Sequence, residues 1–192
     1  MKFLSPQVLL TVGVVLFFLG SLHLWRPLAQ ADRRAFMKLH RWMQPAVPFF
    51  RLLWPVGTLA GILTAAIGIT IWHSWRRGAM LLLAYAIVVL GEMALKRRVA
   101  RQRPFQVLPD ARMAQPRQPE DTSFPSGDAL RVWLMACALG AWLPSPWCWL
   151  LAGVATLVSL GRIALGVHFP LDVIGGAGLG LVAAALAVWL GG

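Results

Sequence analysis

The chain has 192 residues, of which 58% are hydrophobic, and it carries a formal net charge of +11. That hydrophobic fraction excludes an ordinary water-soluble domain, and ten Trp against one Tyr suit a chain with many membrane–water boundaries. Nucleic-acid binding would require an exposed basic face with base-reading or stacking groups, whereas these cations crowd into short connections between apolar runs. We therefore expect one integral-membrane domain over residues 1–192, with anionic headgroups or phosphorylated lipids rather than nucleic acid as partners.

Six apolar runs follow one another along the chain, and we expect each to form a membrane-spanning helix of an all-α bundle. The first run is followed by LAQA, residues 28–31, which is similar to a signal-peptide cleavage site. The length of the run favours an uncleaved helix instead. The six expected spans are residues 4–25, 52–72, 79–95, 126–143, 147–162 and 170–190.

A basic segment, RPLAQADRRAFMKLHRWMQP, separates the first two runs. Its apolar side chains Phe36, Met37, Leu39 and Trp42 are interleaved with five basic residues. This spacing predicts an amphipathic helix that lies in the membrane interface.

Small residues inside the runs predict packing rather than chemistry. Cys137 and Cys148 lie in apolar segments without metal-ligand spacing, so we expect neither a metal site nor a disulfide. The sequence GGAGLG, residues 175–180, has the small-xxx-small spacing of close helix packing rather than the setting of a nucleotide-binding loop.

Six spans would place both termini on one side of the membrane. The basic segment, the polar loop of residues 97–122 and the GVHFP turn would share the other side. Three polar segments meet there: KRRVARQRP after the third run, PSGD at the start of the fourth, and GRIALGVHFPLD between the fifth and sixth. Their convergence is the first indication of a functional site.

The side chains of these segments suit an anion. Ser126 at a helix start, followed by Gly127, would offer a hydroxyl and free backbone N–H groups. Lys96, Arg103 and Arg162 could surround the same anion, because guanidinium groups match phosphate oxygens. Taken singly, such cations are more often headgroup-facing or snorkelling residues, so the prediction depends on their coincidence.

A nucleophile could stand beside this anion. His168 is the one histidine in the three segments, and Asp172 follows it by four residues, close to one helical turn. The carboxylate could hold one ring nitrogen and leave the other free to attack. A cationic cradle with an oriented histidine predicts phosphoryl transfer through a phosphohistidine.

These segments resemble the three signatures of the type 2 phosphatidic acid phosphatases, six-helix membrane enzymes akin to vanadium haloperoxidases. The pattern K-x6-RP begins at Lys96, PSG at Pro125 and R-x5-H-x3-D at Arg162. The resemblance implies that His168 is the nucleophile, that Asp172 supports it, and that no metal or other cofactor is required. It also implies phosphate binding by the other matched residues, namely Lys96, Arg103, Ser126, Gly127 and Arg162.

Two positions depart from the family pattern. Gly161 stands where the third signature usually has Ser, which removes one hydroxyl group. Asp128 stands where the second signature usually has the His that protonates the leaving oxygen. A carboxyl group among Arg and Lys, with Arg131 three residues further along the helix, should be ionised, although burial would oppose this.

An ionised Asp128 would be a poor acid, so an alkoxide would leave slowly, whereas a phosphate leaving group would not need the proton. The sequence therefore favours hydrolysis of a lipid diphosphate, such as polyprenyl diphosphate, over that of a lipid monoester. A lipid phosphotransferase and a non-catalytic phospholipid-binding protein are the alternatives.

The resemblance also implies a multi-pass protein of the bacterial cytoplasmic (inner) membrane with its site on the outer face. The charge distribution points the other way, because the side opposite the site has few cations beyond Lys2, Arg76 and Arg77. We take the outer face as the expectation.

Overall fold

The computed structural model describes residues 5–192, and in this part of the chain helices are the only regular secondary structure. The all-α prediction is therefore confirmed. Leu4 and Lys2, on which two of the predictions above draw, lie outside the described residues. The elements, with three short 3-10 segments labelled η, are α1 (Pro6–Ser21), η1 (Leu22–Leu24), α2 (Arg26–Met43), η2 (Gln44–Ala46), α3 (Val47–Leu53), η3 (Trp54–Gly57), α4 (Leu59–Trp72), α5 (Trp75–Val99), α6 (Pro104–Val107), α7 (Gly127–Trp142), α8 (Ser145–Ala164) and α9 (Pro170–Gly191).

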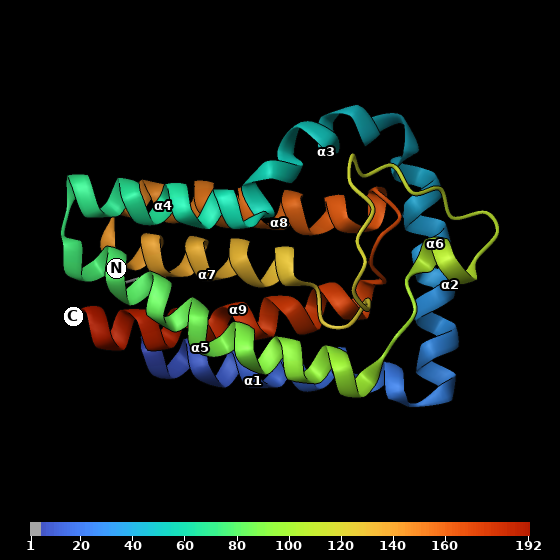
Figure 1. Cartoon of the computed structure of the whole chain (residues 1–192), viewed down its shortest axis with the longest axis horizontal. Coiled ribbons are helices and arrows are strands. Elements are labelled where there is room, and N and C mark those ends of the chain that lie inside the picture. Colours follow the sequence, from blue (N-terminus) through green and yellow to red (C-terminus); the bar gives the residue numbers. More distant parts are fainter. Residues whose placement is uncertain (1–4) are drawn as a thin grey trace.

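The long helices α1, α4, α5, α7, α8 and α9 run along the long axis of the molecule (Figure 1). Helix α1 begins and α9 ends at one end of this bundle, where the α4–α5 and α7–α8 turns also lie. Helix α2, helix α6 and the long loop that precedes α7 cover the opposite end. The two ends thus have the contents that the sequence predicts for the two membrane sides.

The predicted count of six spans is not confirmed. Within residues 5–192, four stretches are long and apolar enough to cross a membrane, namely Pro6–Leu24, Trp75–Val107, Ser145–Ala164 and Pro170–Gly191. A fifth results if Arg26–Gly57 and Leu59–Trp72, which are bent by 57°, form one broken span. Helix α4 has only 14 residues because the 3-10 segment with Pro55 interrupts the second predicted run, and α7 has 16 because it ends before Pro144.

The outward faces of the bundle are apolar, as expected where helices face lipid. Phe18 exposes 65% of its surface, Leu90 exposes 68% and Ile71 exposes 72%. Five of the seven exposed tryptophans gather near the end that holds the termini, at the ends of α4 and α9 and the starts of α5 and α8; they are Trp72, Trp75, Trp147, Trp149 and Trp189. This aromatic belt and the apolar spans describe a multi-pass membrane protein.

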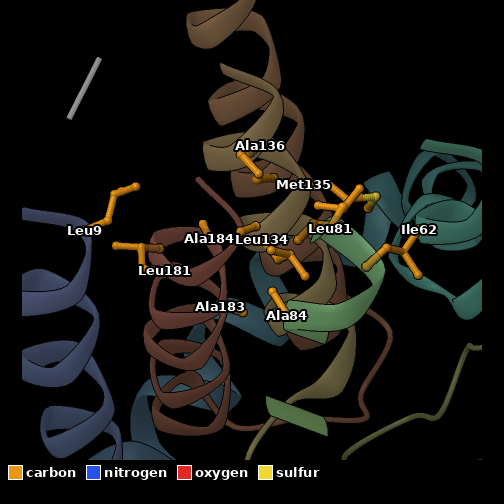
Figure 2. Close-up of a cluster of buried hydrophobic side chains, with 14 of the residues drawn as sticks. Leu9, Ile62, Leu81, Ala84, Leu134, Met135, Ala136, Leu181, Ala183 and Ala184 are labelled. Atoms are coloured by element: carbon orange, nitrogen blue, oxygen red, sulfur yellow. The ribbon is translucent and has the colours of Figure 1, made fainter. Parts of the chain in front are cut away.

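Helix α9 packs against both α1 and α7, and its glycines allow the close approach. A side chain at Gly178 would come within 2.4 Å of the α1 backbone, and one at Gly176 within 2.2 Å of the Ser126 carbonyl oxygen. The packing predicted for GGAGLG is therefore confirmed. Figure 2 shows the apolar core beside this contact, where Leu181 lies near Leu9. Both cysteines are free, and no disulfide links them.

Helix α2 lies across the end of the bundle, roughly perpendicular to the long helices (Figure 1). Its inward face buries Asp32, Phe36, His40 and Met43. Trp42, predicted for the apolar face, is 78% exposed instead. The helix is amphipathic as predicted, but half of the residues on its buried face are polar, because that face meets the site rather than lipid.

Candidate active site

The three polar segments converge beneath α2 and the long loop, around a cavity of about 230 Å³. The cavity wall also includes side chains from η3 and the start of α4. Of the eight residues predicted for the site, six line the cavity, namely Lys96, Arg103, Gly127, Asp128, Arg162 and His168. Ser126 and Asp172 do not line it and are fully buried beside it.

Most of these side chains project from helix ends, where the backbone changes direction. Lys96 and Arg162 stand in the last turns of α5 and α8, and Ser126 is the N-cap residue of α7. His168 lies in the turn between α8 and α9, which Gly166 permits with a φ of +77°. A side chain at Gly166 would also come within 2.2 Å of the carbonyl oxygen of Arg112, so the long loop closes directly over this turn.

The ring of His168 is held by two contacts that fix its tautomer. Nδ1 lies 2.8 Å from the carbonyl oxygen of Ser123, which can only accept, so Nδ1 carries the proton. Nε2 lies 3.1 Å from Arg103 Nη1 and therefore presents its lone pair. Burial, followed by the charge of Arg103, lowers the pKa of His168 to about 3. The imidazole is thus neutral at ordinary pH, as a nucleophile requires.

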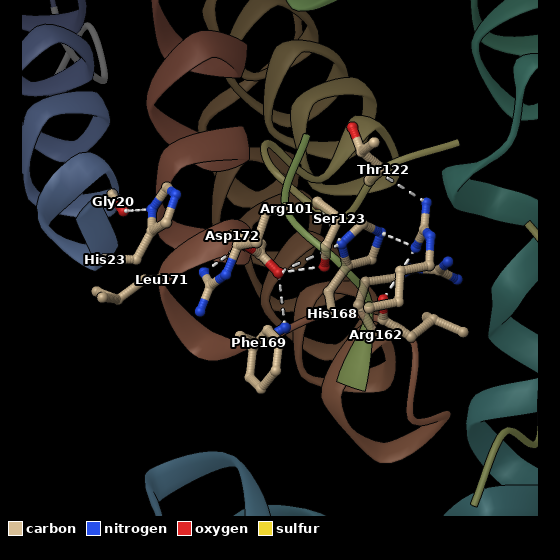
Figure 3. Close-up of polar contacts among 12 residues, drawn as sticks. Gly20, His23, Arg101, Thr122, Ser123, Arg162, His168, Phe169, Leu171 and Asp172 are labelled. Atoms are coloured by element: carbon tan, nitrogen blue, oxygen red, sulfur yellow. Dashed lines mark hydrogen bonds and ion pairs between the residues drawn. The ribbon is translucent and has the colours of Figure 1, made fainter. Parts of the chain in front are cut away.

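Asp172 does not hold the ring in the way the sequence predicts. Its Oδ2 lies 3.8 Å from Nδ1 of His168, beyond hydrogen-bond distance, and the carbonyl oxygen of Ser123 takes the predicted place. Figure 3 shows that Asp172 instead gathers donors around the turn: the hydroxyl of Ser123, the backbone N–H of Phe169 at 2.8 Å and the guanidinium of Arg101 at 2.6 Å. Asp172 therefore supports His168 through the Ser123 segment and as a nearby negative charge.

Arg101 links the site to helix α2. It contacts Asp172 Oδ1 and Asp32 Oδ2 at 2.6 Å each, and its guanidinium lies 4.3 Å from the centre of the Phe169 ring. Asp32 in turn accepts the backbone N–H of Leu171 at 3.0 Å. Sequence reasoning missed Arg101, Asp32 and Ser123. The sequence shows the charges of Arg101 and Asp32. However, nothing in the nine-residue basic segment KRRVARQRP indicates which Arg would contact a carboxylate of the site.

Two of the predicted phosphate ligands share a carboxylate in the structure. Asp121, in the long loop, pairs with Lys96 Nζ and lies 2.6 Å from Arg103 Nη2. Burial would raise the pKa of Asp121, but the charges of Lys96 and Arg103 outweigh it and lower this pKa to about 2. The Asp121 side chain is 52% exposed, so it can leave when another anion arrives. Its two oxygens pair with the two cations that the sequence predicts as phosphate ligands.

Asp128 is likewise neutralised by cations on both oxygens. Oδ2 lies 2.8 Å from Arg162 Nη1, and Oδ1 pairs with Arg131, as predicted from their spacing. Arg131 is held in turn by the carbonyl oxygen of Gly57 at 2.7 Å. A carboxylate between two guanidinium groups is stable as the anion, so this arrangement favours an ionised Asp128.

Two buried donors of the site have neither a hydrogen bond nor an ion pair within residues 5–192: Ser126 Oγ and Arg162 Nε. Ser126 caps α7 through its backbone only, since its hydroxyl does not bond to the helix. Burying such groups unpaired is costly, so they are candidates for contact with a bound anion. In the same part of the chain, no group of three His, Cys, Asp or Glu side chains is placed to hold a metal ion.

The chain is similar in sequence to curated phosphatases. An undecaprenyl-diphosphatase of Sulfolobus acidocaldarius is 43% identical over 102 residues, which cover 52% of this chain and 48% of the relative. A decaprenylphosphoryl-5-phosphoribose phosphatase of Mycobacterium tuberculosis is 36% identical over 117 residues, covering 60% of this chain and 59% of the relative. The matches thus span about half to three fifths of the length of these curated relatives.

Solved structures show the same fold. The crystal structure of Aquifex aeolicus LpxE has a TM-score of 0.74 at 26% identity and covers 81% of this chain and 93% of that one. A transmembrane PAP2-type phosphatidylglycerolphosphate phosphatase from Bacillus subtilis has a TM-score of 0.70 at 23% identity, over 95% of this chain and 94% of that one. The model of the PAP2 superfamily matches residues 75–191, which include all three polar segments. The chain therefore belongs to the PAP2 superfamily.

Proposed function

We propose that this protein is a membrane lipid phosphatase that hydrolyses a lipid diphosphate, similar to polyprenyl diphosphate, through a phosphohistidine at His168. The observation that carries the proposal is the neutral imidazole whose Nε2 lone pair faces Arg103 at the edge of the cation-lined cavity. The names of the relatives, which are phosphatases of polyprenyl-linked substrates, support the same class of reaction.

In the first step, His168 Nε2 attacks the terminal phosphorus as the bond to the leaving phosphate breaks. The incoming phosphoryl oxygens displace the Asp121 carboxylate from Lys96 and Arg103, since both anions need the same donors. Ser126 Oγ and Arg162 Nε gain the partners they lack. These fixed donors stabilise the charge on the transferring group, and no metal ion is assigned a role.

Positive charge develops on the imidazole as the phosphorus–nitrogen bond forms. The Nδ1–H donates to the Ser123 carbonyl oxygen, and the carboxylate of Asp172 stands 3.8 Å from the same nitrogen. Both groups stabilise the charged ring more than the neutral one. A second step, attack of water on the phosphohistidine, releases inorganic phosphate and regenerates the neutral imidazole.

The leaving group distinguishes the substrate class. Asp128 stands where a proton donor is usual, yet both of its oxygens are paired with guanidinium groups. A departing lipid monophosphate is a weak base that needs no proton, whereas a departing alkoxide does. The pairing of Asp128 therefore supports a diphosphate as substrate, and a lipid monoester as a poorer one.

The test is release of inorganic phosphate by the purified protein in detergent, with EDTA present, from a polyprenyl diphosphate and from the monophosphate of the same tail. We expect hydrolysis of the diphosphate at a kcat/KM clearly above that of the monophosphate. Equal rates would contradict the role of Asp128. Tight binding of both lipids without release of phosphate would identify a binding protein. Transfer of the phosphoryl group to an added lipid acceptor would identify a phosphotransferase.

We also propose that the site opens on the outer face of a bacterial cytoplasmic membrane, as the family resemblance implies. A single Cys at Arg112, an exposed loop residue, tests this in a background without Cys137 and Cys148. Labelling of intact cells by a membrane-impermeant maleimide is the expected result. Protection until lysis would place the site in the cytoplasm, in agreement with the distribution of positive charge.

A further inference from the structure

A third carboxylate besides Asp121 and Asp128, that of Glu92, lines the same cavity as His168 and belongs to none of the three signature segments. It stands on α5, one turn before Lys96, and only 5% of its surface is exposed. Its Oε1 lies 3.2 Å from Lys96 Nζ. Its Oε2 has no hydrogen-bond partner among residues 5–192. A buried carboxylate oxygen without a donor is unfavourable, so its retention at the cavity wall calls for a chemical reason.

The start of α7 is shaped to admit Glu92. A Cβ at Gly127 would come within 2.5 Å of Glu92 Oε1, so any larger residue at this position would push the carboxylate away. Gly127 therefore does more than expose a helix N-terminus. It lets an acidic side chain lie against the same helix start that carries the unpartnered hydroxyl of Ser126.

Hydrolysis of a phosphohistidine requires a group that orients water and accepts its proton. Asp128 is poorly suited, because guanidinium groups occupy both of its oxygens. Glu92 has one cation partner and one free oxygen, which is the arrangement that leaves a lone pair for a water O–H. Glu92 and His168 line the same cavity of about 230 Å³, which has room for a water molecule beside a bound phosphoryl group.

We propose that Glu92 is the general base of the second half-reaction, an inference that rests on the proposed function. The water oxygen forms a bond to phosphorus as the phosphorus–Nε2 bond of His168 breaks. The pair of electrons in that bond returns to Nε2, and the water proton passes to Glu92 Oε2. The protonated carboxyl then loses its proton to solvent as inorganic phosphate leaves, which restores the starting state.

The experiment follows a terminal ³²P label from polyprenyl diphosphate into protein and into inorganic phosphate, for the wild type and Glu92→Gln. Proton acceptance of this kind contributes ~10²–10⁴-fold, so turnover of Glu92→Gln should fall by ~10²-fold or more. Acid-labile, alkali-stable label should at the same time accumulate on the variant protein, approaching one per chain. Glu92→Asp, which keeps a carboxylate set back by one methylene, should hydrolyse the intermediate at a rate between those of the wild type and Glu92→Gln.

Glu120→Gln is the matched control, because it removes an equal charge from an exposed residue of the long loop and should behave as the wild type. Loss of turnover in Glu92→Gln without trapped label would show that Glu92 only positions Lys96, and would overturn the inference. Near wild-type turnover of Glu92→Gln would do the same and leave the proposed function intact. A wild type that neither takes up label nor releases phosphate would overturn the proposed function and this inference together.

Discussion

Replacing Arg101 with Met should destabilise the folded protein strongly. The change keeps an apolar stem near the Phe169 ring but leaves Asp172 and Asp32 without their shared cation, at side-chain exposures of 0% and 1%. Breaking a buried ion pair typically costs ~3–5 kcal/mol. Both carboxylates keep backbone N–H donors, from Phe169 and Leu171, so the lower end of ~3 kcal/mol applies. For a chain of this length that corresponds to a fall in Tm of ~6–12 °C.

Thermal unfolding in detergent, followed by tryptophan fluorescence, measures this loss. Arg98→Met is the control, since it removes the same charge from an exposed position on the last turn of α5 and should leave Tm almost unchanged. Adding Asp32→Asn to Arg101→Met should recover part of the loss, because it removes one of the two uncompensated charges. The reasoning is refuted if Arg101→Met unfolds within ~1 kcal/mol of Arg98→Met, the size expected of a surface pair.

Asp128→His combined with Arg131→Leu should raise monoester hydrolysis more than diphosphate hydrolysis, by part of the ~10²–10⁴-fold that proton donation contributes. Asp128→His alone should not raise it, because this change leaves two buried guanidinium groups without a counter-charge. An unchanged substrate ratio in the double variant would count against the role of Asp128. Gly176→Ala should cost ~1–3 kcal/mol of stability because its methyl group would meet the backbone at the start of α7, while Gly153→Ala, with nothing within 4 Å, should be neutral. The pKa of His168 is lowered from 6.5 to about 3 by burial, so only the unfolded chain binds a proton here between those values, and the free energy of unfolding should fall as pH falls through this window. His168→Gln should show a shallower fall, and equal slopes would contradict the assignment.

The sequence predicted the parts of the site that depend on spacing along the chain. The N-cap position of Ser126 and the pairing of Asp128 with Arg131 follow from helical geometry, and the structure places both accordingly. The three segments also converge as the alternation of spans requires. For these features, local rules and the sidedness of helices were sufficient.

The residues that sequence reasoning missed reach the site through tertiary contacts between segments that are distant in the sequence. Ser123 contacts the His168 ring through its backbone carbonyl oxygen. Every residue carries this atom, so the residue type at position 123 could not predict the contact. Asp121 reaches Lys96 and Arg103 only because the loop folds back over the cavity. The break before α4 was also missed, because Pro55 sits inside a run whose hydropathy is continuous.

Phosphate release by His168→Ala from polyprenyl diphosphate tests most directly whether His168 forms the covalent bond to phosphorus. Release should fall to background while the variant keeps the elution profile and membrane insertion of the wild type. His168 is 2% exposed, so His168→Gln, which is closer in volume, serves as a second variant that should be equally inactive. Release by either folded variant at a rate near that of the wild type would contradict the account.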